Sequence, residues 1–408
     1  RILFIGTDAI YIDESNYFLI TKRFFNALFT GNFEGTLVLP HPGITTCWIN
    51  KITLKIAENF LNKELSLLET YYYPKLSFAI ISSILVLIIY LLLNRVFNQK
   101  ISIIASLLIA LNPFLIAHSR IVGTDGLTPL FMTVSLLLFL LFIKENKLYY
   151  VPISGFFAGL AILTKVQGIF LIPFFLFLIL FNFIFDLIKK NKIKLVHILK
   201  QIISPIFWAV GCSIVIVLIL PVFWTKDYEQ ILNILNIKYE QLIRFLTRIT
   251  PRFYLGTNRL EPIYSYYLVV LPFRLTPISF ILAPLAFISI MFKKFNVYVR
   301  KYLKYIICFI FYIIFFLVMM STFTYKGDRL ILPVFPAIDI LSAISIYILY
   351  NLFLDKYNFK HVNKKYKFIS KNSFYLLVSV LIIIHIILYI PFFPHYLAYY
   401  NPLLGGAK

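Results

Sequence analysis

Two adjacent carboxylates, Asp13 and Glu14, follow a short apolar stretch at the start of the chain. Paired carboxylates can supply a general base and a second group that orients a substrate or a cation. Near a membrane they are costly to desolvate, so their position beside apolar residues needs a reason. The alternative is structural, because Asp13 could cap a helix that starts at Ser15. The residue types leave both interpretations open.

Further polar residues could work with this pair. His41 lies between Pro40 and Pro42, whose fixed φ angles would hold it in a rigid turn. A histidine in a loop is also often simply exposed. Arg120 and Asp125 bracket the ends of two consecutive apolar runs. They could pair with each other, or Arg120 could bind a phosphate while Asp125 orients a substrate hydroxyl.

Cations recur at the ends of later apolar runs. Lys165 ends one run, where it could snorkel to the membrane surface or serve a site. Lys326 and Arg329 flank Asp328, and cations beside tyrosines suit a phosphate carried by a lipid. An aromatic belt at the membrane surface explains the residues that begin another run, which are Tyr264, Tyr266, Tyr267 and Arg274. The joint placement of carboxylates, a histidine and cations on one face is more specific than any one of them.

Membrane-spanning helices must position these residues. Of the 408 residues 61% are hydrophobic, and the mean hydropathy is +0.87, which is more apolar surface than a soluble domain can hide. Apolar runs long enough to cross roughly 30 Å of hydrocarbon predict an all-α polytopic bundle. The predicted spans are 75–94, 101–118, 124–143, 148–165, 168–188, 202–224, 267–292, 303–323, 330–353 and 373–393, and residues 1–12 could end another.

The formal net charge of +22 is unevenly distributed. Lysines fill alternate short loops between the spans, at 95–100, 144–147, 189–200, 293–304 and 356–371. This positive-inside pattern predicts that these loops are cytoplasmic and that the other loops, which hold the polar residues described above, are extracytoplasmic. The same distribution argues against nucleic acid as a partner, and membrane lipids are the expected surroundings.

Two long outer loops, 13–72 and 225–266, interrupt the pattern of spans. Each holds amphipathic segments typical of interfacial helices, at 16–29, 44–61 and 228–247. In the first of them, Lys22 and Arg23 lie on a different face from the apolar residues. Pro251, Gly256 and Pro262 indicate an irregular end to the second loop.

The chain shows no internal repeat and no low-complexity linker, so residues 1–408 are expected to form a single membrane domain. It starts at Arg1 and stops after a loop motif, and we expect both ends to be truncated. The three cysteines, Cys47, Cys212 and Cys308, have no metal-binding spacing and are expected to be buried.

Five elements in a fixed order resemble the GT-C glycosyltransferases, in particular family 39, the protein O-mannosyltransferase-like branch that includes the aminoarabinose transferases of lipid A. The elements are Asp13 with Glu14, the sequence His41-Pro42-Gly43, the run from Pro113 through Arg120 to Asp125, the run from Gly159 to Lys165, and the run from Lys326 to Pro333. The loop from Pro394 to Pro402 resembles one that follows the last core span in bacterial and archaeal members. Two departures bear on the acceptor class: the family's usual His-Pro-Pro is His-Pro-Gly here, and most of the first span and any C-terminal soluble domain are missing.

The resemblance implies a GT-C-type bundle of about 10–11 transmembrane helices. It also implies inverting transfer of one sugar from a polyprenyl-phosphate-linked donor to an acceptor outside the cytoplasm. Asp13 would then deprotonate the acceptor hydroxyl, and Glu14 would position the acceptor or the loop. The residues expected to bind the substrate and the donor phosphate are His41, Arg120, Asp125, Lys165, Lys326 and Arg329. No cofactor is firmly implied, although a divalent cation could lie between Glu14 and His41.

Two other functions stay open. A membrane transporter or lipid flippase would place ionisable residues in the middle of spans, and Asp339 is the clearest carboxylate of that kind. Ligation of an oligosaccharide would need a diphosphate-linked donor. The sequence also leaves open whether the acceptor is a protein, a glycolipid or a cell-wall polymer, and it names neither the sugar nor the oligomeric state.

Overall fold

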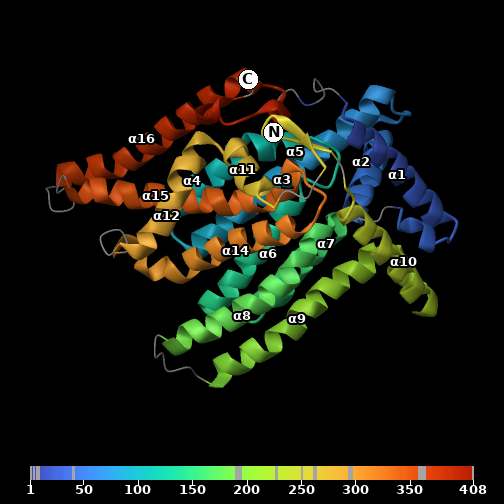
Figure 1. The fold of residues 1–408 in the computed structure, drawn as a ribbon, viewed down its shortest axis with the longest axis horizontal. Coiled ribbons are helices and arrows are strands. Elements are labelled where there is room, and N and C mark those ends of the chain that lie inside the picture. Colours follow the sequence, from blue (N-terminus) through green and yellow to red (C-terminus); the bar gives the residue numbers. More distant parts are fainter. Residues whose placement is uncertain are drawn as a thin grey trace.

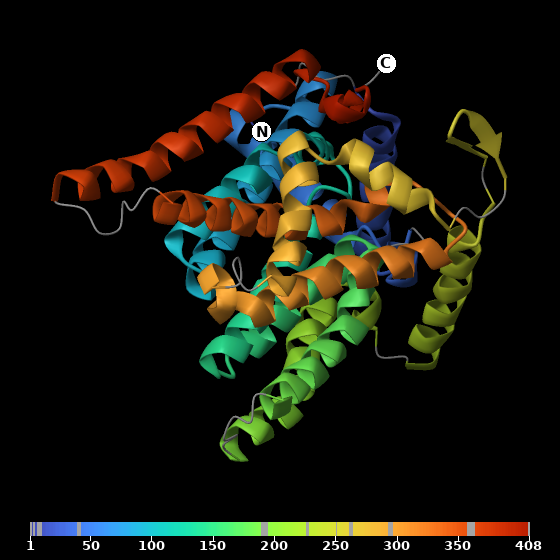
Figure 2. The same ribbon diagram turned by 60° about the vertical axis from the view of Figure 1, so that its left-hand side comes forward.

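The computed structural model describes residues 2, 5, 10–38, 42–188, 195–225, 228–249, 251–260, 264–292, 297–356 and 364–406. Within these residues the chain folds into long helices that run through a common bundle (Figures 1 and 2). His41 and most of residues 1–9 lie outside the described residues, so the predictions made for them are not addressed by the structure.

Helices make up nearly all of the regular structure. The α-helices are α1 (Ile12–Phe29), α2 (Ile44–Leu61), α3 (Leu67–Val96), α4 (Gln99–Leu111), α5 (Pro113–Ser119), α6 (Thr128–Glu145), α7 (Tyr150–Thr164), α8 (Leu171–Ile188), α9 (Leu195–Ile219), α10 (Tyr228–Leu246), α11 (Tyr266–Arg274), α12 (Pro277–Met291), α14 (Leu303–Thr322), α15 (Phe335–Lys356) and α16 (Lys364–Tyr389). The 3-10 helices are η1 (Glu34–Thr36), η2 (Val166–Phe170), η3 (Pro221–Trp224), η4 (Arg300–Tyr302), η5 (Asp328–Val334), η6 (Ile390–Phe392), η7 (Tyr396–Ala398) and η8 (Pro402–Leu404).

The predicted spans coincide with these apolar helices. Among the described residues, seven helical segments are long and apolar enough to cross a membrane, namely Leu67–Val96, Thr128–Glu145, Val166–Ile188, Leu195–Ile219, Val297–Thr322, Asp328–Asp355 and Asn372–Phe392. The pair α4 and α5 adds one more if it counts as a single span bent by 59°, and α7 and α12 are shorter apolar helices. The all-α polytopic class is thereby confirmed.

One predicted span is divided in the structure. The expected span 267–292 consists of α11 and α12, with extended backbone at Leu275 and Thr276 between them. Pro277 disfavours helical backbone at the residue before it. The Thr276 side chain accepts a hydrogen bond from Ser279 N at 3.1 Å and so caps the new helix. The division matters because Arg274, the last residue of α11, is brought to the site described below.

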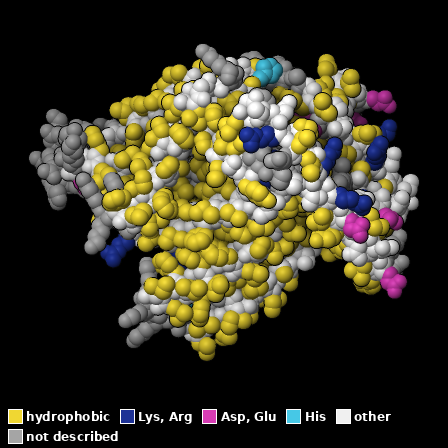
Figure 3. Space-filling view, in the orientation of Figure 1, with side chains coloured by type: hydrophobic (Ala, Val, Ile, Leu, Met, Phe, Trp, Pro, Cys, Tyr) yellow, Lys and Arg dark blue, Asp and Glu magenta, His cyan; other side chains and the backbone are white. Residues whose placement is uncertain are grey.

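Two helices form the centre of the bundle. Most residues of α6 and α15 are buried, whereas α8, α9 and α16 keep much of their apolar surface exposed. In both ribbon views α16 lies along one edge and α9 along the opposite edge. The surface over these outer helices is largely apolar, while charged side chains gather over α1, α2 and α10 (Figure 3). An apolar surface of this extent fits contact with lipid.

Ionic contacts join the basic loops at one end of the bundle. Arg95 at the end of α3 pairs with Glu145 at the end of α6 at 2.9 Å. Lys200 near the start of α9 donates to a backbone carbonyl beside that residue, and Lys304 pairs with Asp186 at 3.1 Å between α14 and α8. We call this the basic end. The structure therefore brings together, at one end of the bundle, loops that the charge pattern assigned to the same side of the membrane. That this end faces the cytoplasm stays a prediction.

The three amphipathic segments are helices, as predicted, and form α1, α2 and α10. After α10 the expected irregular stretch contains a small antiparallel hairpin of β1 (Arg252–Tyr254) and β2 (Thr257–Arg259). Its turn residues Leu255 and Gly256 both have positive φ, at 48° and 82°. Such a turn matches the twist of paired strands and favours glycine, which explains why a hairpin forms here.

Candidate active site

A cavity of about 800 Å³ opens at the end of the bundle opposite the basic end. Its walls come from the N-terminal half of α1, α5 and the loop after it, the turn after α7, the second half of α10, the end of α11 and residues 320–330. Every one of these segments is a helix end, a loop or an amphipathic helix. The cavity therefore lies at one end of the spans and not at their middle.

Four of the predicted site residues meet in this cavity. Arg329 Nη1 pairs with Asp13 and lies 3.7 Å from Asp125 Oδ2. The Lys165 ammonium group pairs with the other oxygen of Asp125. The result is a chain of alternating charges, Asp13, Arg329, Asp125 and Lys165, drawn from four separate segments. Asp13 and Arg329 are the more exposed members, at 48% and 38% of the side chain.

Asp125 is the electrostatic centre of this chain. Burial by itself would raise its pKa, but the positive charges of Lys165 and Arg329 outweigh burial and hold the pKa at about 2. The carboxylate is therefore ionised throughout the physiological range. It can accept hydrogen bonds and balance cations, but it cannot act there as an acid.

A second ion pair, which the sequence analysis did not assign to the site, lies in the same cavity. Arg274 pairs with Asp328, and its guanidinium group also donates to the backbone oxygens of Leu397 at 3.0 Å and Tyr399 at 2.6 Å. The same group lies over the Tyr400 ring, 4.0 Å from its centre. Arg274 had been attributed to an aromatic belt. Only the return of the C-terminal loop to α11 shows that it is part of a site.

Local structure explains how these side chains reach the cavity. Asp13 lies in the first turn of α1, and Lys165 is the first non-helical residue after α7. Arg329 lies in η5, where its backbone N–H donates to Asp328 Oδ1 at 2.8 Å. The loop that carries Asp125 continues through Gly126, where a Cβ atom would lie 2.3 Å from a carbonyl oxygen of α5. Only glycine allows this close approach.

Glu14 faces away from the cavity, contrary to the picture of an acidic pair acting side by side. Its carboxylate is fully buried and pairs with Lys75 of α3 at 3.1 Å. It also accepts hydrogen bonds from Tyr11 N at 3.0 Å and from Val122 N at 3.1 Å. The helix cap is therefore made by Glu14 reaching back to the N-cap residue Tyr11, and Asp13 is not the N-cap.

The suggested divalent cation between Glu14 and His41 does not fit the Glu14 side. Both oxygens of Glu14 already accept hydrogen bonds or pair with Lys75. His41 lies outside the described residues. Within the residues that the structure describes, no group of three or more His, Cys, Asp and Glu side chains is placed to hold a metal ion.

Two predicted phosphate ligands do not line the cavity. Arg120 is buried, with 3% of its surface exposed, where it ends α5. Lys326 donates to the carbonyl oxygens of Met320 at 3.2 Å and Ser321 at 2.7 Å, which closes the end of α14. Burial lowers the pKa of Lys326 to about 8. A cation that satisfies the last carbonyls of a helix has a structural explanation.

Other cavity residues were missed. His118 lines the cavity beside Phe114, and its ring packs edge-on against that ring with 4.9 Å between their centres. Arg23 also lines the cavity, although the pattern of α1 placed it with Lys22 on a face away from the apolar residues. Helical spacing alone did not place Arg23 beside Asp13, because at 3.6 residues per turn a side chain ten positions later is turned about 80° away.

Polar side chains such as Asn16, Thr124 and Gln167 also line the cavity, but a large part of its wall is apolar. The apolar part is formed by Leu19, Ile20, Ile169, Phe170, Leu242, Ile243, Leu246, Met320 and Phe323. The α10 part of this wall is fixed by Tyr325, whose backbone N–H donates to Leu246 O at 3.0 Å and whose ring packs against Phe245. The cavity thus combines a charged cluster with an apolar corridor. That combination suits a molecule with an anionic head and a hydrocarbon chain.

Comparisons with known proteins find one family with a similar sequence and solved structures with a similar fold. Residues 46–224 match the family model described as dolichyl-phosphate-mannose-protein mannosyltransferase. No curated protein matches the sequence. Among solved structures, the chain is similar to ArnT from Cupriavidus metallidurans in the apo state, with a TM-score of 0.51 and 14% identity over 95% of this chain and 63% of that one.

The structure of ArnT bound to undecaprenyl phosphate is similar with a TM-score of 0.50, 14% identity, and coverage of 93% of this chain and 61% of that one. The archaeal oligosaccharyltransferase AglB from Archaeoglobus fulgidus, in complex with an inhibitory peptide and a dolichol-phosphate, has a TM-score of 0.53 and 12% identity. That match covers 91% of this chain and 50% of AglB, so the chain spans between half and two thirds of the length of these proteins. The resemblance found in the sequence is confirmed: the chain has the fold of the GT-C membrane glycosyltransferases, and its residues 46–224 carry the match to the dolichyl-phosphate-mannose-protein mannosyltransferase family.

Proposed function

We propose that this protein transfers one sugar from a polyprenyl-phosphate-linked donor to an acceptor hydroxyl, with inversion, at the extracytoplasmic surface of the cell membrane. One observation carries the proposal. A half-exposed carboxylate, Asp13, lies in the same cavity as four cations, Arg23, Lys165, Arg274 and Arg329, and a large part of the cavity wall is apolar. A base, a phosphate site and a place for a hydrocarbon chain are the parts that this reaction needs.

The donor is the substrate best supported by the cavity. Lys165 and Arg329 can contact a phosphate, and a guanidinium group can donate two hydrogen bonds to a pair of phosphate oxygens, while Arg274, whose Nη donors are engaged by Leu397, Tyr399 and Asp328, adds its positive charge to the cavity wall. The apolar residues of α1, α10 and η2 can hold the isoprenoid chain. Among the similar structures, ArnT is bound to undecaprenyl phosphate and AglB to a dolichol-phosphate. The AglB structure also holds a peptide, so a protein acceptor is one option beside a glycolipid or a polymer.

Asp13 is the proposed general base. The acceptor hydroxyl passes its proton to Asp13 as its oxygen attacks the sugar carbon, and the bond from that carbon to the phosphate oxygen breaks with its electron pair on the phosphate. A single displacement inverts the sugar carbon and needs no covalent enzyme intermediate. Asp125 is a poorer base because two cations hold it. The charge that grows on the leaving phosphate is offset by the cations, which is the larger contribution to catalysis.

Glu14 has a different role in this proposal. Its buried pair with Lys75 and its bond from Val122 N tie the first turn of α1 to α3 and to the loop after α5. Asp13 is attached to that turn and so is held toward Arg329. Glu14 would thus position the loop, which is one of the two functions that the resemblance implies for it. Arg120 and Lys326 act as structural residues, and the roles expected of His41 stay predictions.

The alternatives are weaker on the present geometry. A transporter site is expected near the middle of the spans, whereas this cavity is built from helix ends. Asp339, the mid-span carboxylate, does not line the cavity. Oligosaccharide ligation would use the same fold, and the donor separates the two reactions. A panel of monophosphate-linked sugars and diphosphate-linked oligosaccharides, each assayed with purified protein, distinguishes them.

The direct test is Asp13→Asn. We expect turnover with a polyprenyl-phosphate sugar to fall by about 10²–10⁴-fold, the range typical for loss of a general base. Binding of undecaprenyl phosphate should persist, because the cations remain. The matched control is Glu58→Gln on α2, an exposed carboxylate that pairs with Lys55 outside the cavity. Near-normal turnover in Asp13→Asn would remove Asp13 from the mechanism.

A further inference from the structure

A buried carboxylate inside the bundle has no role in the proposed reaction. Asp339 of α15 is 1% exposed. Its Oδ2 accepts a hydrogen bond from Asn112 Nδ2 at 3.1 Å, and its Oδ1 accepts one from Ser279 Oγ at 2.6 Å. None of the ion pairs between described residues involves it. Burying an ionisable group at this depth costs free energy, and such groups in membrane proteins usually have a structural or functional role. The two hydrogen bonds of Asp339 therefore indicate what that role is.

The first bond holds the bend between α4 and α5. Asn112 lies at this break, where the two helices differ in direction by 59°. Its Oδ1 accepts hydrogen bonds from Phe114 N and Leu115 N, both at 3.2 Å, and so caps α5. The Asn112 amide oxygen thus bonds to the start of α5 while its amide nitrogen bonds to Asp339, and together these bonds fix the direction of α5. That helix carries Phe114 and His118 into the cavity wall.

The second bond holds the start of α12. Ser279 lies in the first turn of this helix, and the capping residue Thr276 donates to Ser279 Oγ at 3.0 Å. Arg274 lies two residues before Thr276, and its guanidinium group lines the cavity. The two arms meet there, because this group lies over the Phe114 ring, 4.7 Å from its centre. One carboxylate thus connects both sides of the Arg274 contact.

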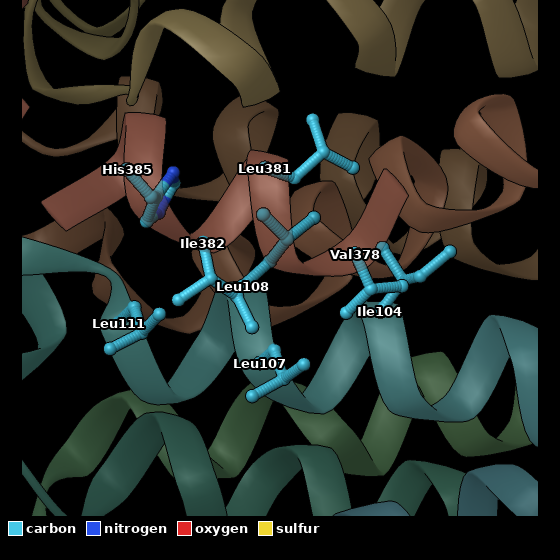
Figure 4. A pocket seen from close by; sticks show the side chains of 8 residues that line it. All are labelled: Ile104, Leu107, Leu108, Leu111, Val378, Leu381, Ile382 and His385. Carbon is cyan, nitrogen blue, oxygen red and sulfur yellow. The ribbon is translucent and has the colours of Figure 1, made fainter. Parts of the chain in front are cut away.

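We propose that Asp339 is a positioning residue that sets α5 against the turn between α11 and α12 and thereby holds the positive charge of Arg274 at the cavity wall, where it attracts the bound phosphate. This inference rests on the proposed function for its ligand. A phosphate site depends on guanidinium placement to a fraction of an ångström. Asp339 itself touches no substrate. Figure 4 shows another buried polar group, His385 of α16, beside apolar side chains of α4 and α16, and its Nε2 shares a hydrogen bond at 2.5 Å with the Tyr389 hydroxyl of its own helix, so this bond does not join two elements.

The test measures binding of undecaprenyl phosphate to the purified chain in lipid nanodiscs. Asp339→Leu removes both bonds and should weaken binding by about tenfold to a hundredfold, whereas Asp339→Asn keeps one acceptor oxygen and should cost less. Ser342→Ala is the matched control, because this hydroxyl of α15 is buried but donates only to Ile338 O of its own helix. It should bind like the unmodified protein.

A double-mutant cycle separates positioning from general loosening of the fold. If Asp339 acts through Arg274, Asp339→Leu should weaken binding little further once Arg274→Gln is present. If the double variant loses affinity by the product of the two single losses, the two residues act independently and the proposal is overturned. Unchanged binding in Asp339→Leu would also overturn it. If Asp339→Leu does not fold, Asp339→Asn and Ser279→Ala carry the same cycle with Arg274→Gln.

A second measurement does not depend on the lipid. Spin labels at Ile121→Cys, after α5, and Leu268→Cys, on α11, report the distance between the two elements, and the three native cysteines are buried. The distance distribution should broaden or shift in Asp339→Leu and stay unchanged in Ser342→Ala. An unchanged distribution in Asp339→Leu overturns the inference. Failure of the unmodified protein to bind undecaprenyl phosphate, with the label result as expected, would instead count against the proposed function.

Discussion

Asp13 and Glu14 are neighbours in the chain but lie in opposite environments. Successive residues of a helix point about 100° apart, so two adjacent side chains in α1 cannot share one direction. Asp13 faces the cavity and Arg329, while Glu14 is buried against Lys75. The pair therefore divides the work between one group that can react and one that holds it. The same division separates Lys165, which faces Asp125, from Lys326, which closes a helix.

Asp125 gives a pH-dependent prediction at this scale. Its pKa is lowered from 3.8 to about 2, so its ion pairs contribute stability that is fully present above pH 4 and is lost as the pH falls toward 2. We expect Asp125→Asn to lower the free energy of unfolding by about 2 kcal/mol at pH 7. The measurement is thermal unfolding in detergent between pH 7 and pH 3.

Glu58→Gln serves as the control for this prediction and should change stability by less than about 0.5 kcal/mol, because its partner Lys55 is exposed. The difference between Asp125→Asn and the unmodified protein should begin to shrink only below pH 4. A difference that already vanished between pH 7 and pH 5 would show that another group is responsible.

The amphipathic helices have a more specific use than resting at the membrane surface. Helix α10 turns Leu242, Ile243 and Leu246 toward the cavity and keeps Leu232 outward, 62% exposed. Helix α1 contributes both Asp13, the proposed general base, and part of the apolar wall. A surface helix can thus complete a site that the spans only begin. The periodicity of the sequence predicted these helices but not which of their faces would line a cavity.

Substitution in α10 tests the apolar corridor. Leu242→Ser should weaken binding of undecaprenyl phosphate by about tenfold or more, since burying one leucine is worth about 1.5–3 kcal/mol. Binding of a phosphate with a very short chain, such as ethyl phosphate, should change little, because it has almost no hydrocarbon to place against the apolar wall. Leu232→Ser, on the outward face, is the matched control. Equal losses for long and short chains would place the corridor elsewhere.

The two ends of the bundle differ in the kind of charged loops that they carry. The basic end joins Arg95, Lys200 and Lys304 to partners from other spans, and the cavity lies at the far end of those spans. If the basic end faces the cytoplasm, the proposed reaction takes place outside it.

Labelling of single cysteines in intact cells tests the orientation. Cysteines placed at Glu64 and Asn258, in the two loops of the cavity end, should react with a maleimide that does not cross membranes. Cysteines at Lys100 and Lys147 should react only after the cells are permeabilised. The native cysteines are buried and should give a low background. The opposite labelling pattern would indicate the opposite orientation in the membrane and would contradict an extracytoplasmic reaction.

The sequence by itself determined the spans, the grouping of their loops and the three amphipathic helices. These follow from patterns local to the chain: long apolar runs, loop charge and helical periodicity. The division of the span 267–292 was also within reach, because Pro277 disfavours helix at Thr276.

Tertiary structure alone decided which polar residues share the cavity. Arg274 entered because the C-terminal loop returns to bind it, and Arg120 and Lys326 left because they are buried at helix ends. The partner of Glu14 is Lys75, more than fifty residues away, and that of Asp13 is Arg329, more than three hundred away. The direction of a charged side chain depends on which opposite charge or carbonyl the fold brings near it, and no pattern within a single helix contains that information.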